Sequence, residues 1–334
     1  MQNAIASKVL ITGGAGFIGS HLTDALLSQG CEVVVLDNFV TGTAENLSHL
    51  ESNPGLEIVQ GSVMDYEIVD RLAGRVDTVI HLAAAVGVQW VIENLVDTLN
   101  TNTKGTKNVL ISAKAHGVQN VLIASTSEVY GKNPNMPYSE DDDVVIGPSS
   151  IGRWGYACSK MFDEYLALAY HKEQGLPVTI VRLFNTTGPR QTGRYGMVVP
   201  RFVSAALKNE TITIHGNGNQ TRCFAHVEDV AAALIKISKC AEAVGEVYNL
   251  GSEQRISINE LASVVKEITG SNSPVVHIPY SEVYGPDFED MVDRIPDISK
   301  INEAIDYVPQ RSLTEIVRDV ADYLALAAQS GNDS

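Results

Sequence analysis

A glycine-rich turn near the start of the chain constrains the fold more than any other feature. The turn TGGAGFIGS contains Gly13, Gly16 and Gly19 and follows the strand-like run VLIT at 9–12. In a strand–turn–helix unit, the first glycine permits the tight turn, the second lets the backbone approach a pyrophosphate, and the third lets helix and strand pack closely. The N–H groups and dipole of the following helix then attract phosphate. The motif therefore predicts a dinucleotide-binding site.

An acidic residue at the end of the next strand-like run indicates which dinucleotide binds. Asp37 follows Gly19 by 18 residues, and its neighbours Asn38 and Phe39 bring no arginine. A carboxylate at this position accepts hydrogen bonds from the adenosine ribose and repels the extra phosphate of NADP. The sequence therefore predicts NAD as the cofactor.

Short apolar runs alternate with helical stretches through the first half of the chain. The predicted helices lie near 17–29, 65–73, 100–116 and 156–174. The predicted strands are nearly continuous in apolar residues and cover 9–12, 33–36, 57–60, 78–83, 121–125 and 178–183. Such runs are typical of strands buried on both faces of a parallel sheet. Their alternation with helices predicts an α/β fold with a Rossmann-type, doubly wound parallel sheet.

The pattern becomes less regular after residue 184, with helices expected near 198–208 and 257–269. The run GEVYNLG at 245–251 again resembles a buried strand, so we expect the chain to return to the first sheet. The division into domains is then discontinuous. We expect an NAD-binding domain, a smaller α/β substrate domain and a flexible tail, covering respectively 1–183 plus about 225–252, about 184–224 plus 253–328, and 329–334.

The net charge of −16 on 334 residues limits the possible partners. Nucleic acid and anionic membranes repel so acidic a surface, and neither is expected to bind. No apolar run reaches the roughly 18–20 residues of a membrane span, and the N-terminus lacks a secretory signal pattern. The four cysteines have no metal-ligand spacing. We therefore expect reduced thiols, no metal site and a cytoplasmic location.

Tyr156 and Lys160 form a Tyr-x-x-x-Lys pair at the start of a predicted helix. One helical turn places the two side chains on the same face. An ammonium beside a phenol favours the phenolate, so the pair predicts a tyrosine pKa lowered from about 10 toward neutrality. Such a tyrosine can take a hydroxyl proton while hydride leaves for NAD. A surface ion pair is the alternative, but the segment LIASTSEVYG at 122–131 ends a strand, where active sites of α/β sheets form.

Five motifs follow one another along the chain: TGGAGFIGS, HLAAAV (81–86), STSEVYG (125–131), YACSK (156–160) and RLFNTTGPR (182–190). Together they resemble the extended short-chain dehydrogenase/reductases that act on nucleotide sugars, the NAD-dependent epimerase/dehydratase family. The resemblance implies a nucleotide-sugar substrate and a homodimer. It also implies that Thr126 hydrogen-bonds the sugar 4-hydroxyl, that Tyr156 is the base, and that Lys160 holds Tyr156 and the nicotinamide ribose.

The same resemblance implies a set of cofactor-binding residues. Relatives often carry Asp where this chain has Ser62, which weakens one adenine contact. Besides Tyr156 and Lys160, the expected residues are Gly13, Gly16, Phe17, Ile18, Gly19, Asp37, Asn38, Ser62, Val63, Leu82, Ala83, Ala84 and Asn102.

The triplet Thr126-Ser127-Glu128 indicates which chemistry follows oxidation of the sugar at C-4. A 4-keto group acidifies the C-5 proton, which a glutamate could remove or return. The 4,6-dehydratases of the family carry Thr-Asp-Glu, and their Asp protonates the departing C-6 hydroxyl; Ser127 is a much poorer acid. UDP-glucuronate decarboxylases carry Thr-Ser-Glu, as here, and their β-keto acid loses carbon dioxide without a strong acid. The resemblance favours decarboxylation of UDP-glucuronate to a UDP-pentose with recycled NAD.

Other functions remain open from the sequence. A nucleotide-sugar 4-epimerase is the first alternative, although such enzymes usually carry a small or hydroxyl residue where Glu128 stands. A dehydratase is the second. A non-catalytic NAD-binding sensor belongs to a different class, and the intact Thr126, Tyr156 and Lys160 argue against it. Glu128 could also be a structural salt bridge or a helix cap.

Three polar residues are candidates to bind the substrate. The segments GPSSIGRWGYACSK (147–160) and DRIPDISK (293–300) resemble parts of UDP-glucuronate decarboxylases and UDP-xylose synthases. Arg294 is therefore a candidate to meet the diphosphate or the glucuronate carboxylate. Arg222 matches an arginine that grips the nucleotide diphosphate in relatives, and an arginine fork suits phosphate oxygens. Asn185, after the sixth predicted strand, is the third candidate.

Overall fold

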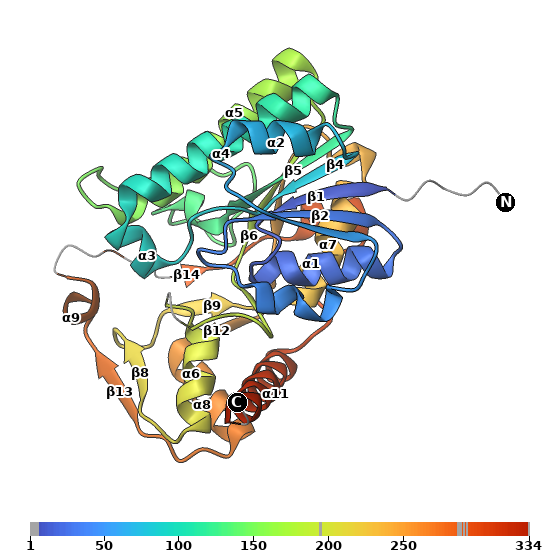
Figure 1. Ribbon diagram of the computed structural model, residues 1–334. Helices are drawn as coiled ribbons and strands as arrows, with labels where there is room; N and C mark the ends of the chain where they lie inside the picture. The colour runs from blue at the N-terminus through green and yellow to red at the C-terminus, as the bar shows by residue number, and fades with distance from the viewer. Residues whose placement is uncertain (1–6, 194–195, 286–288, 290, 292, 333–334) are drawn as a thin grey trace.

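The apolar runs of the first half form one parallel sheet, as the sequence predicts. In the computed structural model, which describes residues 7–193, 196–285, 289, 291 and 293–332, this sheet has seven strands in the order β11-β6-β5-β4-β1-β2-β3 (Figure 1). The strand order reverses between β1 and β4, which opens a crevice at the carboxyl edge of the sheet. The strands are β1 (Lys8–Thr12), β2 (Glu32–Asp37), β3 (Leu56–Gln60), β4 (Thr78–His81), β5 (Asn120–Thr126), β6 (Val178–Leu183) and β11 (Val247–Leu250).

Helices cover both faces of this sheet, because its strands are apolar on both sides. On one face, α1 (Phe17–Ser28) and α7 (Val227–Ser238) pack in a core that contains Leu22 and Val230. On the other, a core containing Leu72, Leu110 and Ala167 joins three helices to the sheet (Figure 1). These helices are α2 (Tyr66–Ala73), α4 (Leu95–His116) and α5 (Arg153–Gln174).

The chain leaves the sheet after β6 and later returns to it. The predicted return of the run at 245–251 is confirmed, because β11 pairs in parallel with β6. A further return was not expected. Ile301 of α10 (Ser299–Ile305) and Tyr307 lie in the same core as α1 and α7. The range 253–328 expected for the second domain therefore includes residues that pack on the sheet of the first.

A smaller part of the molecule has its own core between α6 (Val198–Leu207), α8 (Ile258–Thr269) and α11 (Leu313–Asn332). The helices α6 and α8 match the predictions, whereas α7 and α11 were not predicted. Helix α11 continues to Asn332, past the expected end of ordered chain at Ala328. Strands of this part are β8 (Ile212–His215), β9 (Thr221–Cys223), β12 (Arg255–Ser257), β13 (Val275–Ile278) and β14 (Asp293–Arg294).

The remaining elements of the described chain are short. They are η1 (Ala44–Leu50), α3 (Val88–Glu93), η2 (Ser127–Tyr130), β7 (Thr186–Thr187), β10 (Ala225–His226), η3 (Ala241–Ala243) and α9 (Tyr280–Tyr284). The strands β7 and β10 pair in parallel with each other.

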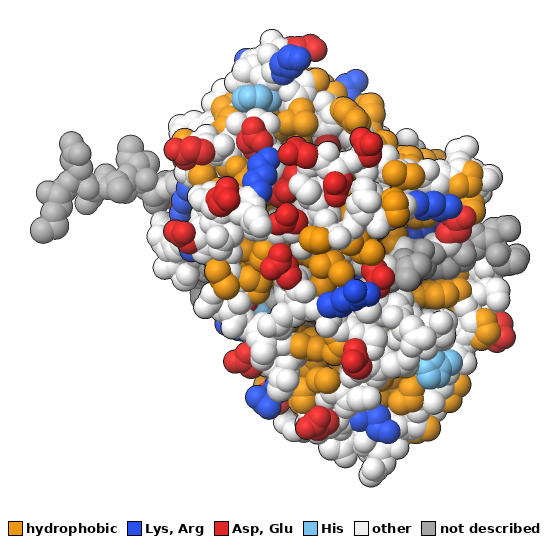
Figure 2. Space-filling model, turned by 180° about the vertical axis from the view of Figure 1, so that it is seen from behind, with side chains coloured by type: hydrophobic (Ala, Val, Ile, Leu, Met, Phe, Trp, Pro, Cys, Tyr) orange, Lys and Arg blue, Asp and Glu red, His pale blue; other side chains and the backbone are white. Residues whose placement is uncertain are grey.

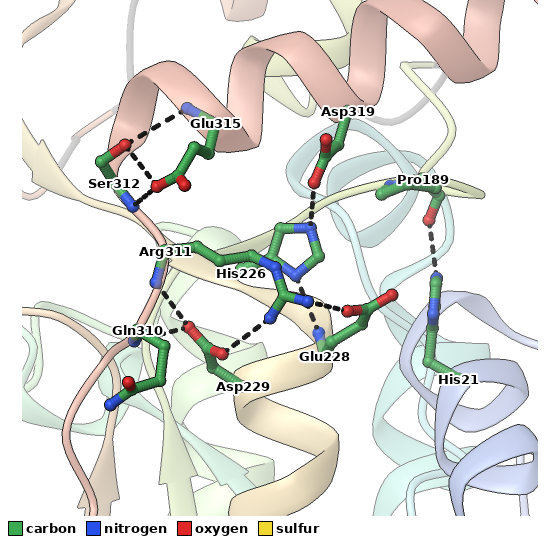
Figure 3. A network of polar contacts seen from close by, with 10 residues as sticks. All are labelled: His21, Pro189, His226, Glu228, Asp229, Gln310, Arg311, Ser312, Glu315 and Asp319. Atoms are coloured by element: carbon green, nitrogen blue, oxygen red, sulfur yellow. Dashed lines mark hydrogen bonds and ion pairs between the residues drawn. The ribbon is translucent and has the colours of Figure 1, made fainter.

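Ion pairs connect the start of α7, a helix that packs on the sheet, with α11 and the residues just before α11 (Figure 3). Arg311 donates to Asp229, with 2.9 Å between Nη1 and Oδ1, and also pairs with Glu228. Buried His226 lies 3.3 Å from Asp319 of α11. Acidic residues in the first turn of a helix are favoured by its dipole, so the start of α7 is a natural place for these pairs.

The surface agrees with the acidic composition. Figure 2 shows acidic side chains spread over one face, whereas lysine and arginine side chains do not merge into a continuous patch. Within the described part of the chain, none of the helices combines the length and the apolar character that crossing a membrane requires.

Candidate active site

A cavity of about 810 Å³ opens at the carboxyl edge of the sheet and is lined by both parts of the molecule. This volume lies near the upper end of the roughly 300–1,000 Å³ that is usual for small-molecule sites. The cavity brings together nearly all the residues predicted from the sequence. They are Gly13, Gly16, Phe17, Ile18, Gly19, Asp37, Asn38, Ser62, Val63, Leu82, Ala83, Ala84, Thr126, Ser127, Glu128, Tyr156, Lys160, Asn185, Arg222 and Arg294.

The glycine-rich turn is built for close backbone approach. Gly13 has a φ of 76°, and a Cβ there would lie 2.8 Å from the backbone N of Ala83. A Cβ at Gly19 would lie 2.2 Å from the carbonyl oxygen of Gly13. Gly16 precedes α1 without a side-chain cap, so the start of this helix presents backbone N–H groups. Only glycines allow this cradle, and it suits a pyrophosphate.

Asp37 is held in place by the turn that it faces. Its Oδ2 accepts a hydrogen bond from the Ala15 N–H at 2.9 Å, and its Oδ1 accepts one from the Phe39 N–H at 2.8 Å. Burial raises the pKa of this carboxyl, and the backbone hydrogen bonds act in the opposite direction. The cradle and the fixed carboxylate fit the pyrophosphate and adenosine ribose of NAD.

Two predicted cofactor residues are engaged in internal hydrogen bonds. Asn102 lies behind the cavity wall instead of lining it: its Oδ1 accepts from the Ala85 N–H and its Nδ2 donates to the Ser159 Oγ, both at 3.0 Å. Both ends of its amide are therefore used to join the loop after β4 to α5. Ser62 does line the cavity, and its Oγ accepts a hydrogen bond from the Met64 N–H at 3.1 Å.

The predicted catalytic residues come from three elements, β5, η2 and α5. Thr126 ends β5, and Ser127 and Glu128 begin η2, where the Thr126 Oγ1 accepts a hydrogen bond from the Glu128 N–H at 3.3 Å. Tyr156 and Lys160 lie in the first two turns of α5. These five residues, which we call the catalytic row, line the same cavity as the glycine-rich turn.

The predicted lowering of the Tyr156 pKa is wrong for the protein alone. Burial and, after it, the charge of Glu128 raise the pKa of this phenol, although a hydrogen bond with Thr126 acts the other way. The ammonium of Lys160 instead lies 3.4 Å from the carboxylate of Asp163, deep in the protein. The sequence spacing placed Lys160 on the correct face of the helix, but Asp163 shares that face.

Glu128 is held between two arginines. Its Oε1 lies 3.2 Å from the Nη1 of Arg294 and 3.5 Å from the Nη2 of Arg153. Arg153 begins α5, and Arg294 belongs to β14 in the other part of the molecule. The salt bridge considered as an alternative role for Glu128 is therefore present, and all three side chains still line the cavity.

The arginines predicted to bind substrate are neighbours in a small sheet. Arg222 of β9 and Arg294 of β14 are register partners in adjacent parallel strands. The guanidinium of Arg222 also donates to the Thr221 carbonyl at 2.8 Å. Asn185 donates to the Cys223 carbonyl at 3.3 Å. Both arginines thus reach the cavity from the same wall.

A group of lining residues in the smaller part was not predicted. The Nη1 of Arg201 lies 2.6 Å from the Nε2 of His215, whose Nδ1 lies 3.2 Å from the Tyr284 hydroxyl. Burial, followed by the charge of Arg201, lowers the pKa of His215 to about 4, so the imidazole is neutral at physiological pH. These residues come from α6, β8 and α9, and no local motif connects them.

A second arginine–carboxylate cluster lies behind the catalytic row and is buried. Arg182 of β6 meets Glu164 of α5 through two hydrogen bonds of 3.0 and 2.8 Å. Arg182 also donates to the Tyr130 hydroxyl at 2.9 Å, and Ser125 donates to Glu164. The cluster joins β5, β6, η2 and α5, the elements that carry or adjoin the catalytic row.

Comparison with known proteins gives a consistent family. Residues 9–251 match the model of the NAD dependent epimerase/dehydratase family. The chain is 41% identical over 317 residues to the UDP-N-acetyl-alpha-D-glucosaminuronate decarboxylase of Bacillus cytotoxicus, covering 95% of this chain and 97% of the relative. It is 38% identical over 318 residues to UDP-glucuronic acid decarboxylase 1 of Arabidopsis thaliana, covering 95% and 69%.

A solved structure has the same fold along the whole chain. The UDP-glucuronic acid 4-epimerase from Bacillus cereus, in complex with UDP-glucuronic acid and NAD, superposes with a TM-score of 0.86 at 29% identity. The match covers 96% of this chain and 99% of that one. Together with the glycine cradle, Asp37 and the Tyr156–Lys160 row, these likenesses identify the chain as an NAD-dependent enzyme of the epimerase/dehydratase family.

Proposed function

We propose that this enzyme decarboxylates a UDP-linked uronic acid, with UDP-glucuronate as the first candidate, and releases a UDP-pentose. The observation that carries the proposal is Glu128, which contacts two arginines and lies in the same cavity wall as Tyr156 and Lys160. Ser127 precedes it where a dehydratase needs an acid. The similarity to two UDP-uronate decarboxylases supports the same assignment.

The residues divide the reaction among them. Tyr156, assisted by Thr126, takes the proton of the sugar 4-hydroxyl, and bound NAD supplies the chemistry of accepting the hydride and returning it later. The bond from C-5 to the carboxyl carbon then breaks, its electrons move toward the C-4 oxygen, and carbon dioxide leaves. Glu128 directs a proton to C-5, and Tyr156 returns its proton when C-4 is reduced. No external reductant is consumed.

We further propose which parts bind which ligand. Residues 1–183 with about 225–252 hold NAD, and about 184–224 with 253–328 hold the nucleotide sugar, apart from the segment around α10. Arg222 and Asn185 contact the diphosphate, and the arginine fork suits its oxygens. Arg201, His215 and Tyr284 line the same cavity.

One alternative within the same chemistry has a specific observation in its favour. The Bacillus cereus structure contains UDP-glucuronic acid in a 4-epimerase, so a uronate substrate by itself does not require decarboxylation. Epimerisation needs only removal and return of hydride at C-4, and it leaves no task for Glu128 at C-5.

Product analysis tests the proposal. Purified protein with NAD is given UDP-glucuronate or its 2-acetamido analogue, and the products are identified by mass spectrometry and carbon dioxide release. We expect the product to be a UDP-pentose or its 2-acetamido counterpart. A product that keeps the carboxylate and has an inverted C-4 would reject decarboxylation and establish epimerisation instead. In Tyr156→Phe we expect turnover and transient NADH absorbance to fall by about 100- to 10,000-fold, the usual contribution of general acid–base catalysis.

We also propose that the enzyme is a homodimer in the cytoplasm. Phe162 and Tyr165 on α5 and Val96 on α4 are 51%, 66% and 71% exposed, an apolar surface that a second copy would cover. The four free cysteines suit a reducing compartment. Light scattering should report twice the chain mass, and Tyr165→Glu should halve it, whereas Val308→Glu, exposed between α10 and α11, should not.

A further inference from the structure

The lysine of the catalytic row has a buried carboxylate as its partner, and the proposed reaction gives that carboxylate no role. Asp163 follows Lys160 by about one turn of α5, and their side chains are 0% and 2% exposed. The Lys160 Nζ lies 3.4 Å from the Asp163 Oδ2. Lys160 lines the cavity, whereas Asp163 does not. Because burial of a carboxylate is costly, an aspartate in this place should have a function that offsets the cost.

The surroundings of Asp163 oppose and support its charge in turn. Burial raises the pKa of Asp163, and the charge of Lys160 and a hydrogen bond with Thr106 of α4 act the other way. The neighbouring Glu164 raises it as well, by a smaller effect. A carboxylate only accepts hydrogen bonds, so the Thr106 hydroxyl is the donor. Asp163 therefore has a neutral partner on α4 in addition to the ammonium on its own helix.

The neutral partner belongs to a directed chain of hydrogen bonds. The Thr106 Oγ1 lies 3.1 Å from the His81 Nε2, and the His81 Nδ1 lies 2.7 Å from the Thr12 Oγ1. The Thr12 oxygen accepts from the Ala83 N–H at 3.3 Å. Since the Thr106 hydroxyl donates to the carboxylate, its oxygen accepts from Nε2–H, and Nδ1 accepts from Thr12. Every donor in the chain points toward Asp163, so β1, β4 and α4 fix this carboxylate in place.

Lys160 is the adaptable member of the pair. Its ammonium is carried on a flexible four-carbon stem, and it shares a helix face with Tyr156. The 3.4 Å contact with Asp163 is longer than the roughly 2.7–2.9 Å of a good charge-assisted hydrogen bond. A small change of side-chain torsions therefore suffices to move the ammonium away from the fixed carboxylate.

The charges around Tyr156 show what the pair does to the phenol. Burial and then the charge of Glu128 on η2 raise the pKa of Tyr156. The charge of Asp163 adds to this effect, and that of Arg294 on β14 acts the other way. Arg294 and Arg153 both contact Glu128. An ammonium beside a phenol favours the phenolate, so a carboxylate that neutralises the ammonium opposes ionisation of the phenol.

We propose that Asp163 is a positioning residue that withholds the Lys160 ammonium from Tyr156 in the protein alone, and that ligand binding releases the ammonium to act on the phenol. Asp163 acts through the lysine and touches no reacting atom. The inference rests on the proposed function only in that Tyr156 is the base at C-4, a step that epimerisation shares. Its effect is that an empty site keeps a protonated phenol, and the base forms where a sugar hydroxyl can use it.

The pH dependence of NADH formation tests the inference in Asp163→Asn, which keeps the shape and removes the charge. Stopped-flow absorbance measures the rate for NAD-loaded enzyme at limiting and at saturating UDP-glucuronate, which report the free enzyme and the complex respectively. At limiting substrate we expect the acid limb of the profile to move about 1–2 pH units lower, because the ammonium is no longer neutralised. At saturating substrate the limb should move by less than about half a unit, since binding has already released the ammonium.

Phenolate absorbance gives a second readout that needs no turnover. It is measured without ligands, as the absorbance that is lost in the matching Tyr156→Phe protein. At one alkaline pH, Asp163→Asn should contain more phenolate than the wild type. In a Lys160→Met background, Asp163→Asn should add none, because an aspartate buried without its cation takes up a proton.

Three results would overturn the inference. In Asp163→Asn, the acid limb could stay or move to higher pH, which would mean that the aspartate keeps the lysine charged. It could move equally at limiting and saturating substrate, so that binding releases nothing. Asp163→Asn could also gain phenolate in the Lys160→Met background, which would show that it acts on Tyr156 directly.

A second variant keeps the test decisive if Asp163→Asn does not fold, as judged by NAD-dependent thermal stabilisation. Thr106→Val removes the neutral donor and weakens the carboxylate, so the acid limb at limiting substrate should move lower by a smaller amount; an unchanged limb overturns the inference. Failure of the proposed function is recognised separately. A wild-type enzyme that forms NADH but releases no carbon dioxide would reject decarboxylation and leave the role of Asp163 standing.

Discussion

Two arginine–carboxylate clusters that both include a residue of α5 have opposite character. Arg182 and Glu164 are both buried and meet through two short hydrogen bonds, with Tyr130 and Ser125 completing the cluster. Glu128 contacts Arg153 and Arg294 through a single oxygen at 3.5 and 3.2 Å, at the wall of the cavity. The first cluster joins the helix α5 to the sheet strands β5 and β6. The second reaches across the cavity between the two parts of the molecule.

The difference shows how the same chemical groups serve structure or function. A charge pair with both hydrogen-bonding edges satisfied costs several kcal/mol to break when it is buried, so it fixes the elements around it. A pair with long contacts and access to a cavity is easier to exchange. Geometry and access, rather than residue type, separate the buried cluster from the cluster at the cavity wall.

The largest expected effect comes from breaking the tight cluster. Arg182→Gln leaves Glu164 as a buried carboxylate without its cation, and we expect the free energy of unfolding to fall by roughly 3–5 kcal/mol. Chemical denaturation measures the change. The control is Arg75→Gln, which breaks an exposed two-hydrogen-bond pair with Glu57 and should cost at most about 1 kcal/mol. Equal losses in the two variants would remove the distinction drawn between the clusters.

Breaking the loose cluster should affect turnover instead. In Glu128→Gln we expect decarboxylation to slow about 100-fold, equivalent to about 2.7 kcal/mol of transition-state stabilisation, because C-5 loses its acid–base group. Formation of NADH in a single turnover should persist, since Thr126 and Tyr156 remain. Stopped-flow absorbance and carbon dioxide release separate the two steps. Full turnover in Glu128→Gln would show that its contacts are only structural.

The smallest effect concerns His81, a buried histidine that contacts two hydroxyl groups. His81 of β4 lies between the hydroxyls of Thr12 and Thr106, at 2.7 and 3.1 Å. Burial, with a smaller effect of Lys160, lowers the pKa of His81 from 6.5 to about 3. The unfolded chain therefore binds a proton that the native protein does not, and stability falls as the pH drops through this window.

Between pH 6.5 and about 5.5 this single group should cost about 1 kcal/mol of unfolding free energy. The measurement is denaturation of the wild type and His81→Gln at both pH values. The variant should lose that much of the pH dependence, because glutamine does not titrate. An identical pH dependence in the two proteins would mean that His81 is not neutral in the native state.

Much of the fold could be predicted because its signals are local. The strands β1 to β6 match the continuous apolar runs, and the glycine-rich turn follows β1 as its motif requires. Even the return of the chain at β11 was predicted from a short buried run. Helices α7 and α11 were missed, and so was the packing of α10 on the first core. After residue 184 the spacing of apolar residues is irregular, so it does not indicate in which hydrophobic core a segment packs.

The candidate site divides in the same way. The lining residues were found by motif, but Asn102 turned out to lie behind the wall, because Ala85 and Ser159 use both ends of its amide. Arg201, His215 and Tyr284 gave no motif, since they come from three separate elements. They come together only through the packing of the smaller part, so no regular spacing in the sequence predicts their contact.

The sequence by itself determined an NAD-binding strand–turn–helix unit and a tyrosine–lysine pair on one helical face, because both depend on residues that are close in the chain. Only the tertiary structure decided the electrostatic state of the site. Lys160 pairs with Asp163 instead of lowering the Tyr156 pKa. Glu128 meets Arg153 and Arg294, which are 25 and 166 residues away. Burial and the meeting of distant charges set these interactions, and neither is encoded in local spacing.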